Sequence, residues 1–219
     1  MVRWEPGARD RLRAAAMDLY VSRGYEKTTA ADIAEAVGLT ERTFFRHFAD
    51  KREVIFDGQE LLAQAFLDGV AAAPPDATPI EMVTSTLAAA ATFFPDERRD
   101  YSRRRQMIIS ENPALQEREL LKLAHLAEVA AGALRSRGVP EPLATLAAQS
   151  ATTVFAVAFA QWIADGEQRS FLALEHEVLA EFVTMATGSA EAGSAGAGST
   201  GPTGAGSAGT GSVGSAPAG

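Results

Sequence analysis

The sequence of 219 residues contains no cysteine and only three histidines, which excludes several kinds of chemistry. Disulfide bonds and cysteine-containing zinc sites cannot form. The three histidines, His47, His125 and His176, lie far apart in the chain without metal-ligand spacing, so a histidine metal site has no support. We therefore expect no metal, no cofactor and no catalytic residues. A chain without cysteine is compatible with the reducing cytoplasm.

The sequence also lacks a long uninterrupted apolar run. Its N-terminus has no apolar segment of the kind found in signal peptides, and no later stretch is continuously apolar over the roughly 18 to 20 residues that cross a bilayer. Residues 143–164 come nearest, but their many alanines among threonine, serine and glutamine are typical of a close-packed buried helix. We expect a cytoplasmic protein with no membrane partner.

Positive charge is in short supply, since the net charge of -8 argues at first against a nucleic-acid partner. The charge is unevenly distributed. Residues 1–58 carry ten basic and ten acidic side chains, whereas residues 59–219 carry ten and eighteen. The acidity therefore belongs to the C-terminal part, and the neutral N-terminal part can still present a basic face. This weak overall field predicts moderate non-specific affinity for DNA.

The end of the chain has low complexity. Residues 188–219 hold 11 of the 19 glycines and a single charged side chain. Such a composition cannot bury enough apolar surface to offset the entropy of ordering, so we expect a disordered Gly/Ser/Ala-rich tail.

The rest of the sequence has helical periodicity and no convincing strand pattern, which predicts an all-α fold. A single long fourth helix is expected from the cap at residue 50 to the prolines at 74 and 75. The other expected helices cover residues 8–23, 29–37, 40–47, 80–94, 97–110, 114–137, 141–165 and 171–187. We divide the chain into an N-terminal three-helix domain at residues 9–69 and a C-terminal helical bundle at residues 70–187.

Residues 32–51 have the pattern of a helix-turn-helix. Thr29 and Asp32 have the spacing of a capping box at the start of one helix, and Thr40 is a natural N-cap for the next. Gly38 can take the left-handed conformation that a short turn between two helices requires. Ala34 is small enough to let the two helices approach closely. Several local features thus agree on one supersecondary structure.

The second helix of this pair, residues 40–47, would present a polar surface to a DNA groove. Phe44 is expected to face inward. Arg42 could make a bidentate contact to guanine, worth about 1 to 3 kcal/mol of discrimination, and Thr43 could meet a thymine methyl group or a phosphate. Thr29, and Lys51 with the amides beside it, could hold backbone phosphates. An ordinary helical corner with solvated charges would have a similar pattern.

These residues resemble the N-terminal domain of TetR-family repressors. The resemblance covers residues 9–69 and is carried by Gly-Tyr-Glu-Lys-Thr-Thr at 24–29, Asp-Ile-Ala at 32–34, Val-Gly-Leu-Thr at 37–40, Thr-Phe-Phe-Arg-His-Phe at 43–48 and Asp-Lys at 50–51. It implies a homodimer that binds a near-palindromic double-stranded operator. It also implies a ligand pocket in the C-terminal bundle whose occupation releases the DNA.

The resemblance also implies which residues contact DNA. The family's contacts fall on Thr29, Thr40, Arg42, Thr43, Phe45, His47 and Lys51. Phe45 stands where the family usually has tyrosine, so a hydroxyl contact to phosphate is missing, and Arg46 or His47 could compensate. Arg46 therefore joins the predicted DNA contacts.

The bundle offers weaker signals for a ligand. Its bulky groups and one arginine are candidate ligand contacts, namely Phe66, Phe94, Tyr101, Arg104, Met107, Phe159 and Trp162. Aromatic and methionine side chains suggest an apolar small-molecule effector. In this fold the last two helices usually form the dimer interface, and we expect Phe171, Leu172, Leu179 and Phe182 to contribute to it.

Two other functions are compatible with a helical chain. A ligand-binding or scaffold protein could keep the helix-turn-helix shape without binding an operator. A helical-bundle enzyme is the weakest alternative, because no general base, nucleophile or metal-ligand cluster stands out in the sequence.

Overall fold

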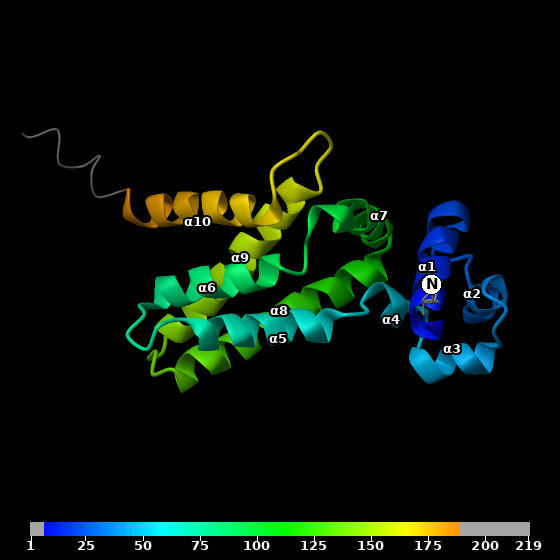
Figure 1. The fold of residues 1–219 in the computed structure, drawn as a ribbon, viewed down its shortest axis with the longest axis horizontal. Helices are drawn as coiled ribbons and strands as arrows, with labels where there is room; N and C mark the ends of the chain where they lie inside the picture. Colours follow the sequence, from blue (N-terminus) through cyan, green and yellow to red (C-terminus); the bar gives the residue numbers. More distant parts are fainter. Residues whose placement is uncertain (1–6, 189–219) are drawn as a thin grey trace, which may run out of the picture. The chain divides into compact units, whose positions relative to one another are not determined.

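The computed structural model describes residues 7–188, and within that range it contains helices and no strands (Figure 1). The predicted all-α fold is confirmed. The predicted tail, residues 188–219, lies outside the described residues except for Gly188. The helices are α1 (Ala8–Arg23), α2 (Ala30–Ala36), α3 (Glu41–His47), α4 (Lys51–Ile55), α5 (Gln59–Ala72), α6 (Pro79–Ala91), the 3-10 turn η1 (Asp96–Arg98), α7 (Arg99–Ser110), α8 (Pro113–Ser136), α9 (Leu143–Trp162) and α10 (Phe171–Thr187).

Helices α1 to α3 pack together as the sequence predicts. The capping box at the start of α2 is confirmed, because the Thr29 hydroxyl accepts from the amide of Asp32 and the Asp32 carboxylate accepts from the amide of Thr29. Gly38 has a φ of 68°, the left-handed conformation that separates α2 from α3. Thr40 caps α3 by accepting from the amide of Thr43. Local sequence signals therefore fix the helix-turn-helix.

The predicted single fourth helix is wrong, because the chain forms two helices there. Asp50 caps α4 as expected, accepting from the amides of Arg52 and Glu53. The helix ends at Ile55, however, and Gly58 has a φ of 88° before α5 begins. An Asp-Gly dipeptide, here Asp57-Gly58, is a turn signal, and the backbone follows it.

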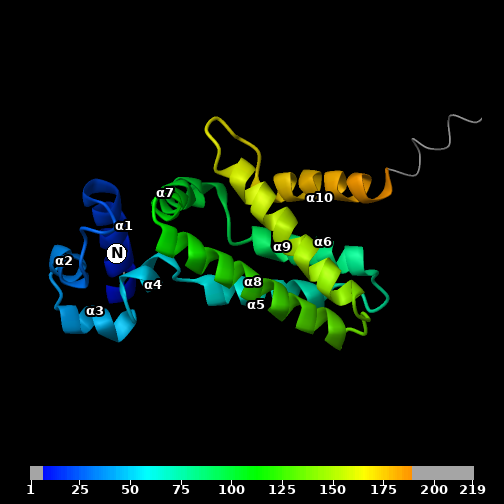
Figure 2. The same ribbon diagram turned by 180° about the vertical axis from the view of Figure 1, so that it is seen from behind.

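The bundle is built mainly from α5, α6, α8 and α9, which lie side by side in both views (Figures 1 and 2). Helices α5 and α6 approach most closely at Gly69, where a Cβ atom would lie 2.5 Å from the Cα of Thr86. Only glycine permits this approach without a backbone shift. The core of the bundle is large and apolar, and it includes Phe66 and Trp162.

Helix α9 is long and apolar enough to cross a membrane by length and composition alone. Its side chains argue for a different setting. Ala151, Phe155, Ala158 and Trp162 are buried in the core cluster of the bundle. The predicted close-packed buried helix is confirmed.

Helix α10 contributes one buried charged residue to the same core. Glu175 has no exposed surface, and neither of its carboxylate oxygens has a hydrogen-bond partner among the described residues. Burial raises the pKa of Glu175 to about 9, because the ionised form would lose its hydration. The side chain is therefore protonated at neutral pH.

The helix-turn-helix helices have a separate core that the bundle helps to complete. Leu12, Tyr20, Ile33 and Phe44 lie in this second cluster, together with Ile108 at the end of α7. Ile109 and Leu115 also belong to the cluster. The junction of α7 and α8 thus packs into the core of the DNA-binding domain, which gives the bundle a direct apolar contact with it.

Candidate nucleic-acid interface and ligand cavity

Helix α3 has one buried face and one exposed face. Phe44 has no exposed surface, as predicted, and Phe48 packs beside it with 5.6 Å between ring centroids. Glu41, Arg42, Phe45 and Arg46 are exposed. The helix-turn-helix core therefore anchors α3 through one side and leaves the other side open for a partner.

The exposed face of α3 carries two arginines that have no structural role. Among the described residues, neither Arg42 nor Arg46 has an ion pair or a side-chain hydrogen bond. Phe45 is 51% exposed and packs edge-on against Phe44, with 5.4 Å between ring centroids. Two free guanidinium groups beside an exposed aromatic ring suit a phosphate backbone and a groove.

The other predicted residues of this helix flank that face. The hydroxyl groups of Thr40 and Thr43 are hydrogen-bonded 3.0 Å apart, and Thr40 is exposed. His47 is half-buried, and its carbonyl oxygen accepts from Arg9 of α1 at 3.2 Å. The structure thus brings Thr40, Arg42 and Thr43 together with Phe45, Arg46 and His47 on one short helix.

Lys51 is placed differently from the expected phosphate contact. Its Nζ donates to the carbonyl oxygens of Tyr25, Glu26 and Thr28, at 2.9, 3.4 and 3.1 Å, and lies 4.3 Å from the centroid of the Tyr25 ring. These contacts tie the start of α4 to the loop before α2. In this arrangement Lys51 has no N–H left for a phosphate.

The helix N-termini that were candidates for phosphate binding are also occupied. The carboxylate of Asp50 holds the first free amides of α4. The Thr29 hydroxyl donates to Asp32 at 2.6 Å, and these bonds from Thr29 hold the pKa of Asp32 below its ordinary value. Thr29 is nevertheless exposed and lies at the start of α2. A phosphate contact at either position requires these local bonds to be shared or exchanged.

An acidic residue in the break between α4 and α5 ties this break to α1. Asp57 accepts from Arg9 at 2.5 Å and from Arg13 at 3.4 Å, both in α1. Arg9 in turn donates to the carbonyl of His47 and lies 4.8 Å from the centroid of the Phe48 ring. Asp57 is thereby connected to the C-terminal end of α3 through one arginine.

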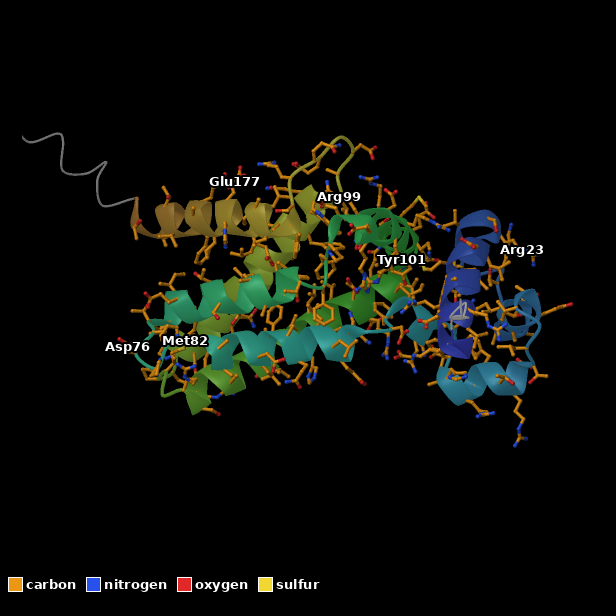
Figure 3. All side chains as sticks on the ribbon, in the orientation of Figure 1. Arg23, Asp76, Met82, Arg99, Tyr101 and Glu177 are labelled. Carbon is orange, nitrogen blue, oxygen red and sulfur yellow. The ribbon has the colours of Figure 1, made fainter. Side chains whose placement is uncertain are left out.

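A cavity lies against this break. Three of the predicted ligand contacts, Phe94, Tyr101 and Phe159, line it. The remaining lining residues come from α4, α5 and the break between them, from η1 and the segment before it, and from α7, α8 and α9. They include Ile55, Asp57, Gln59, Leu62, Phe93, Arg98, Ser102, Arg105, Glu119, Leu123 and Phe155. Tyr101 is labelled on α7 in Figure 3, in the orientation of Figure 1. The cavity therefore adjoins the segment that leads to the helix-turn-helix.

The other four predicted ligand contacts do not line this cavity. Phe66 and Trp162 have no exposed surface and belong to the packed core. Met107 is 44% exposed on the outside of α7. Arg104 pairs with Asp18 of α1 at 2.6 Å. Bulk and charge in the sequence did not distinguish core and surface positions from lining positions.

The polar residues of the cavity were missed in the sequence. Arg98 lies in η1, and Arg105 is the third of the consecutive arginines in α7. In the structure Arg105 turns inward and pairs with Glu119 at 2.8 Å. Nothing local in the sequence marks Arg98 or Gln59 as lining residues.

The last two helices carry apolar groups on both faces. Phe171 and Leu179, expected at a dimer interface, are buried in the core of the single chain, and Phe182 packs partly against it. This corrects the expectation that Phe171 and Leu179 lie at the dimer interface, because α10 packs these side chains against the core of the bundle. Six large apolar side chains of α9 and α10 are exposed, namely Leu143, Leu146, Val157, Leu172, Val183 and Met185.

Comparisons with known proteins agree with this architecture. The family model described as "Bacterial regulatory proteins, tetR family" matches residues 12–57. A second family model, described as the MftR C-terminal domain, matches residues 77–189, about half of the chain. Between them the two models cover both the helix-turn-helix and the bundle.

Individual relatives give the same picture. The HTH-type transcriptional regulator TcmR of Streptomyces glaucescens is 40% identical over 81 residues, which are 37% of this chain and 36% of TcmR. The match thus spans about a third of that relative. A TetR-family transcriptional regulator from Syntrophomonas wolfei has a similar fold, with a TM-score of 0.56 at 16% identity over 81% of this chain and 94% of that chain. The TetR transcriptional regulator from Nitrosomonas europaea has a TM-score of 0.52 at 19% identity over 83% and 99% of the two chains.

Proposed function

The chain belongs to the TetR family of bacterial regulatory proteins, which are DNA-binding transcriptional regulators, and from this premise we propose how it binds DNA and responds to a ligand. Two copies of the chain place their α3 helices in successive major grooves of a near-palindromic operator. An apolar small molecule in the cavity beside α7 lowers the affinity for that operator. The protein acts in the cytoplasm and has no catalytic step.

The exposed face of α3 carries the proposal for operator binding. Arg42 and Arg46 have no ion-pair partner among the described residues, whereas Phe44 anchors the helix in the core. Arg42 reaches base edges from the N-terminal half of α3, where recognition helices make such contacts. Arg46, Thr40 and Thr43 contact phosphates or thymine methyl groups, and Phe45 packs against the sugar-phosphate backbone.

Lys51 and Thr29 have supporting roles in this proposal. Lys51 holds the loop before α2 against α4 through three carbonyl groups, so it positions the helix-turn-helix. Thr29 lies at the exposed start of α2, where a phosphate can share its capping bonds.

Dimerisation is required because one α3 helix covers only half of such an operator. The recognition helices of a dimer must lie about 34 to 36 Å apart to fit successive grooves. The proposed contact between the two copies is formed by four exposed apolar residues of α9 and α10, namely Leu143, Leu146, Val157 and Leu172. The same surface on both copies gives a two-fold symmetric dimer.

Helix α4 connects the cavity to the DNA-binding domain. Arg105 donates to the carbonyl of Ile55 at 2.9 Å, and Arg118 pairs with Glu53. On the other side, Asp57 holds Arg9 of α1. A ligand that fits only when α4 shifts would therefore change the position of α1 and α3. It can weaken operator binding by no more than its difference in affinity for the two arrangements.

The test of operator binding is a mobility-shift titration with the DNA that flanks the protein's own gene, compared with shuffled DNA of the same composition. We expect a dimer to bind the flanking DNA at least a hundredfold more tightly. Equal affinity for both DNAs would contradict operator binding and favour a ligand-binding or scaffold protein. The variant Arg135→Ala, which removes the same charge from α8 in the bundle, is the control and should bind as the wild type does.

A further inference from the structure

The cavity beside the α4–α5 break adjoins a wider hollow. The cavity itself has a volume of about 80 Å³, and the hollow between α7, α8 and α9 has a volume of about 450 Å³. Both are lined by Glu119, Leu123, Phe155 and Phe159. A molecule can therefore place an apolar body in the hollow and extend one end into the cavity, since binding sites for small molecules usually have 300 to about 1,000 Å³.

The charged residues of the cavity are unequally paired. Arg105 has Glu119 as its partner at 2.8 Å, and Asp57 has two arginines of α1. Arg98 is half-buried and has no carboxylate within 4.0 Å among the described residues; its one hydrogen bond goes to the carbonyl of Phe93 at 3.1 Å. It is the guanidinium of the cavity that is left without a countercharge.

The surroundings of Arg98 make the absence of a paired carboxylate energetically unfavourable. Burial lowers the pKa of Arg98. The positive charges of Arg13 and Arg105 act in the same direction and outweigh the opposite effects of Tyr101 and Asp57. A guanidinium remains protonated under such conditions, so it stays an unneutralised cation in a partly desolvated place. An anion beside it would remove this penalty and form charge-assisted hydrogen bonds.

A second polar group of the cavity also lacks a partner. The side-chain oxygen of Gln59, at the start of α5, is buried and accepts no hydrogen bond from the described residues. Buried polar atoms in folded proteins nearly always have a partner, so an unpaired acceptor on a cavity wall points to a donor on the ligand. Leu62, Phe94 and Phe159 supply apolar walls around the two groups.

We propose that the cavity binds an apolar molecule that carries one anionic group, a carboxylate or a related oxyanion, against Arg98, and a hydroxyl or N–H donor against Gln59. This inference rests on the proposed function, because the molecule is the effector that fills the cavity. It sharpens the expected effector from a purely apolar compound to an amphipathic anion.

The experiment compares two fluorescent probes that differ in one anionic group. 8-Anilino-1-naphthalenesulfonate carries a sulfonate and an N–H, and N-phenyl-1-naphthylamine has the same rings and N–H without the sulfonate. Each is titrated into the full chain as wild type, Arg98→Gln, Arg98→Lys and Arg104→Gln. Arg104 does not line the cavity and pairs with Asp18 of α1, so Arg104→Gln is a control for non-specific attraction of the sulfonate.

We expect the wild type to bind the sulfonate at least tenfold more tightly than the neutral probe, since a hydrogen bond to a charged group contributes this much. Arg98→Gln should lose about tenfold for the sulfonate only, Arg98→Lys should lose less, and Arg104→Gln should bind as the wild type does. Unchanged binding of the neutral probe shows that the Arg98→Gln cavity is intact.

Two results would overturn the proposal. One is equal affinity of the wild type for both probes, and the other is the same affinity of wild type and Arg98→Gln for the sulfonate. Failure of the proposed function would be distinguishable from these results. The unliganded wild type would then bind operator DNA and shuffled DNA equally, while the ratio of the two probe affinities would be unchanged.

Discussion

The arginines of α3 and α7 are used in opposite ways. In α7, Arg99, Arg103, Arg104 and Arg105 each pair with a carboxylate. Arg99 also points toward the loop between α9 and α10, where it donates to the carbonyls of Glu167 and Arg169 (Figure 3). In α3, neither arginine has such a partner among the described residues. The arginines of α7 thus bind other parts of the chain, whereas the arginines of α3 remain available to a partner molecule.

The largest predicted effect separates the two faces of α3. Phe44→Ala should lower the free energy of unfolding by about 3 to 5 kcal/mol, because it leaves a cavity in the helix-turn-helix core. Phe45→Ala should leave the stability nearly unchanged and lower the affinity for DNA. Urea denaturation of both variants, followed by circular dichroism, measures the difference. Similar losses of stability in the two variants would mean that α3 has no free face.

The next effect concerns the carboxyl group that the bundle buries without a hydrogen-bond partner among the described residues. The folded pKa of Glu175 lies near 9 and its ordinary value is 4.5, so the folded state holds a proton that the unfolded state releases. The stability should therefore fall as the pH rises from about 5 to 9. Glu175→Gln, which cannot ionise, should gain roughly 3 kcal/mol of stability relative to the wild type between pH 5 and pH 7, at about 1.4 kcal/mol per pH unit. A difference that does not vary with pH would contradict the buried, protonated carboxyl.

A smaller effect tests the contact between α1 and the break that separates α4 from α5. The side chain of Asp57 is nearly buried and pairs with Arg9 and Arg13. Asp57→Asn removes its charge and should cost about 1 to 2 kcal/mol of stability. Asp18→Asn is the matched control, because the Asp18 pair with Arg104 is largely exposed and should contribute less than about 0.5 kcal/mol. Thermal unfolding of the two variants makes the comparison. Equal effects would show that Asp57 is an ordinary surface partner.

The same contrast explains what the sequence could predict. The helix-turn-helix depends on caps and a turn that act over a few residues, so Thr29, Gly38 and Thr40 could be assigned correctly. The cavity depends on contacts between helices far apart in sequence, as in the pairing of Arg105 with Glu119 or Arg104 with Asp18. No local pattern reveals such partners, and four of the seven predicted ligand contacts accordingly lie away from the wall of this cavity.

The missed break between α4 and α5 has a different cause. The turn signal at Gly58 was present in the sequence, but the apolar periodicity on both sides of it favoured one continuous helix. The error matters for function, since Asp57 and Gln59 lie at that break and line the cavity.

The central claim is that the unpaired arginines of α3 bind operator DNA, and the most direct test is the ratio of operator affinity to non-specific affinity in Arg42→Ala. Fluorescence anisotropy titrations at several salt concentrations measure both affinities for the wild type, Arg42→Ala and the control Arg135→Ala. We expect the ratio of operator affinity to non-specific affinity to fall about tenfold or more in Arg42→Ala, because a bidentate contact to guanine is lost. The ratio should stay unchanged in Arg135→Ala. An unchanged ratio in Arg42→Ala would contradict the central claim.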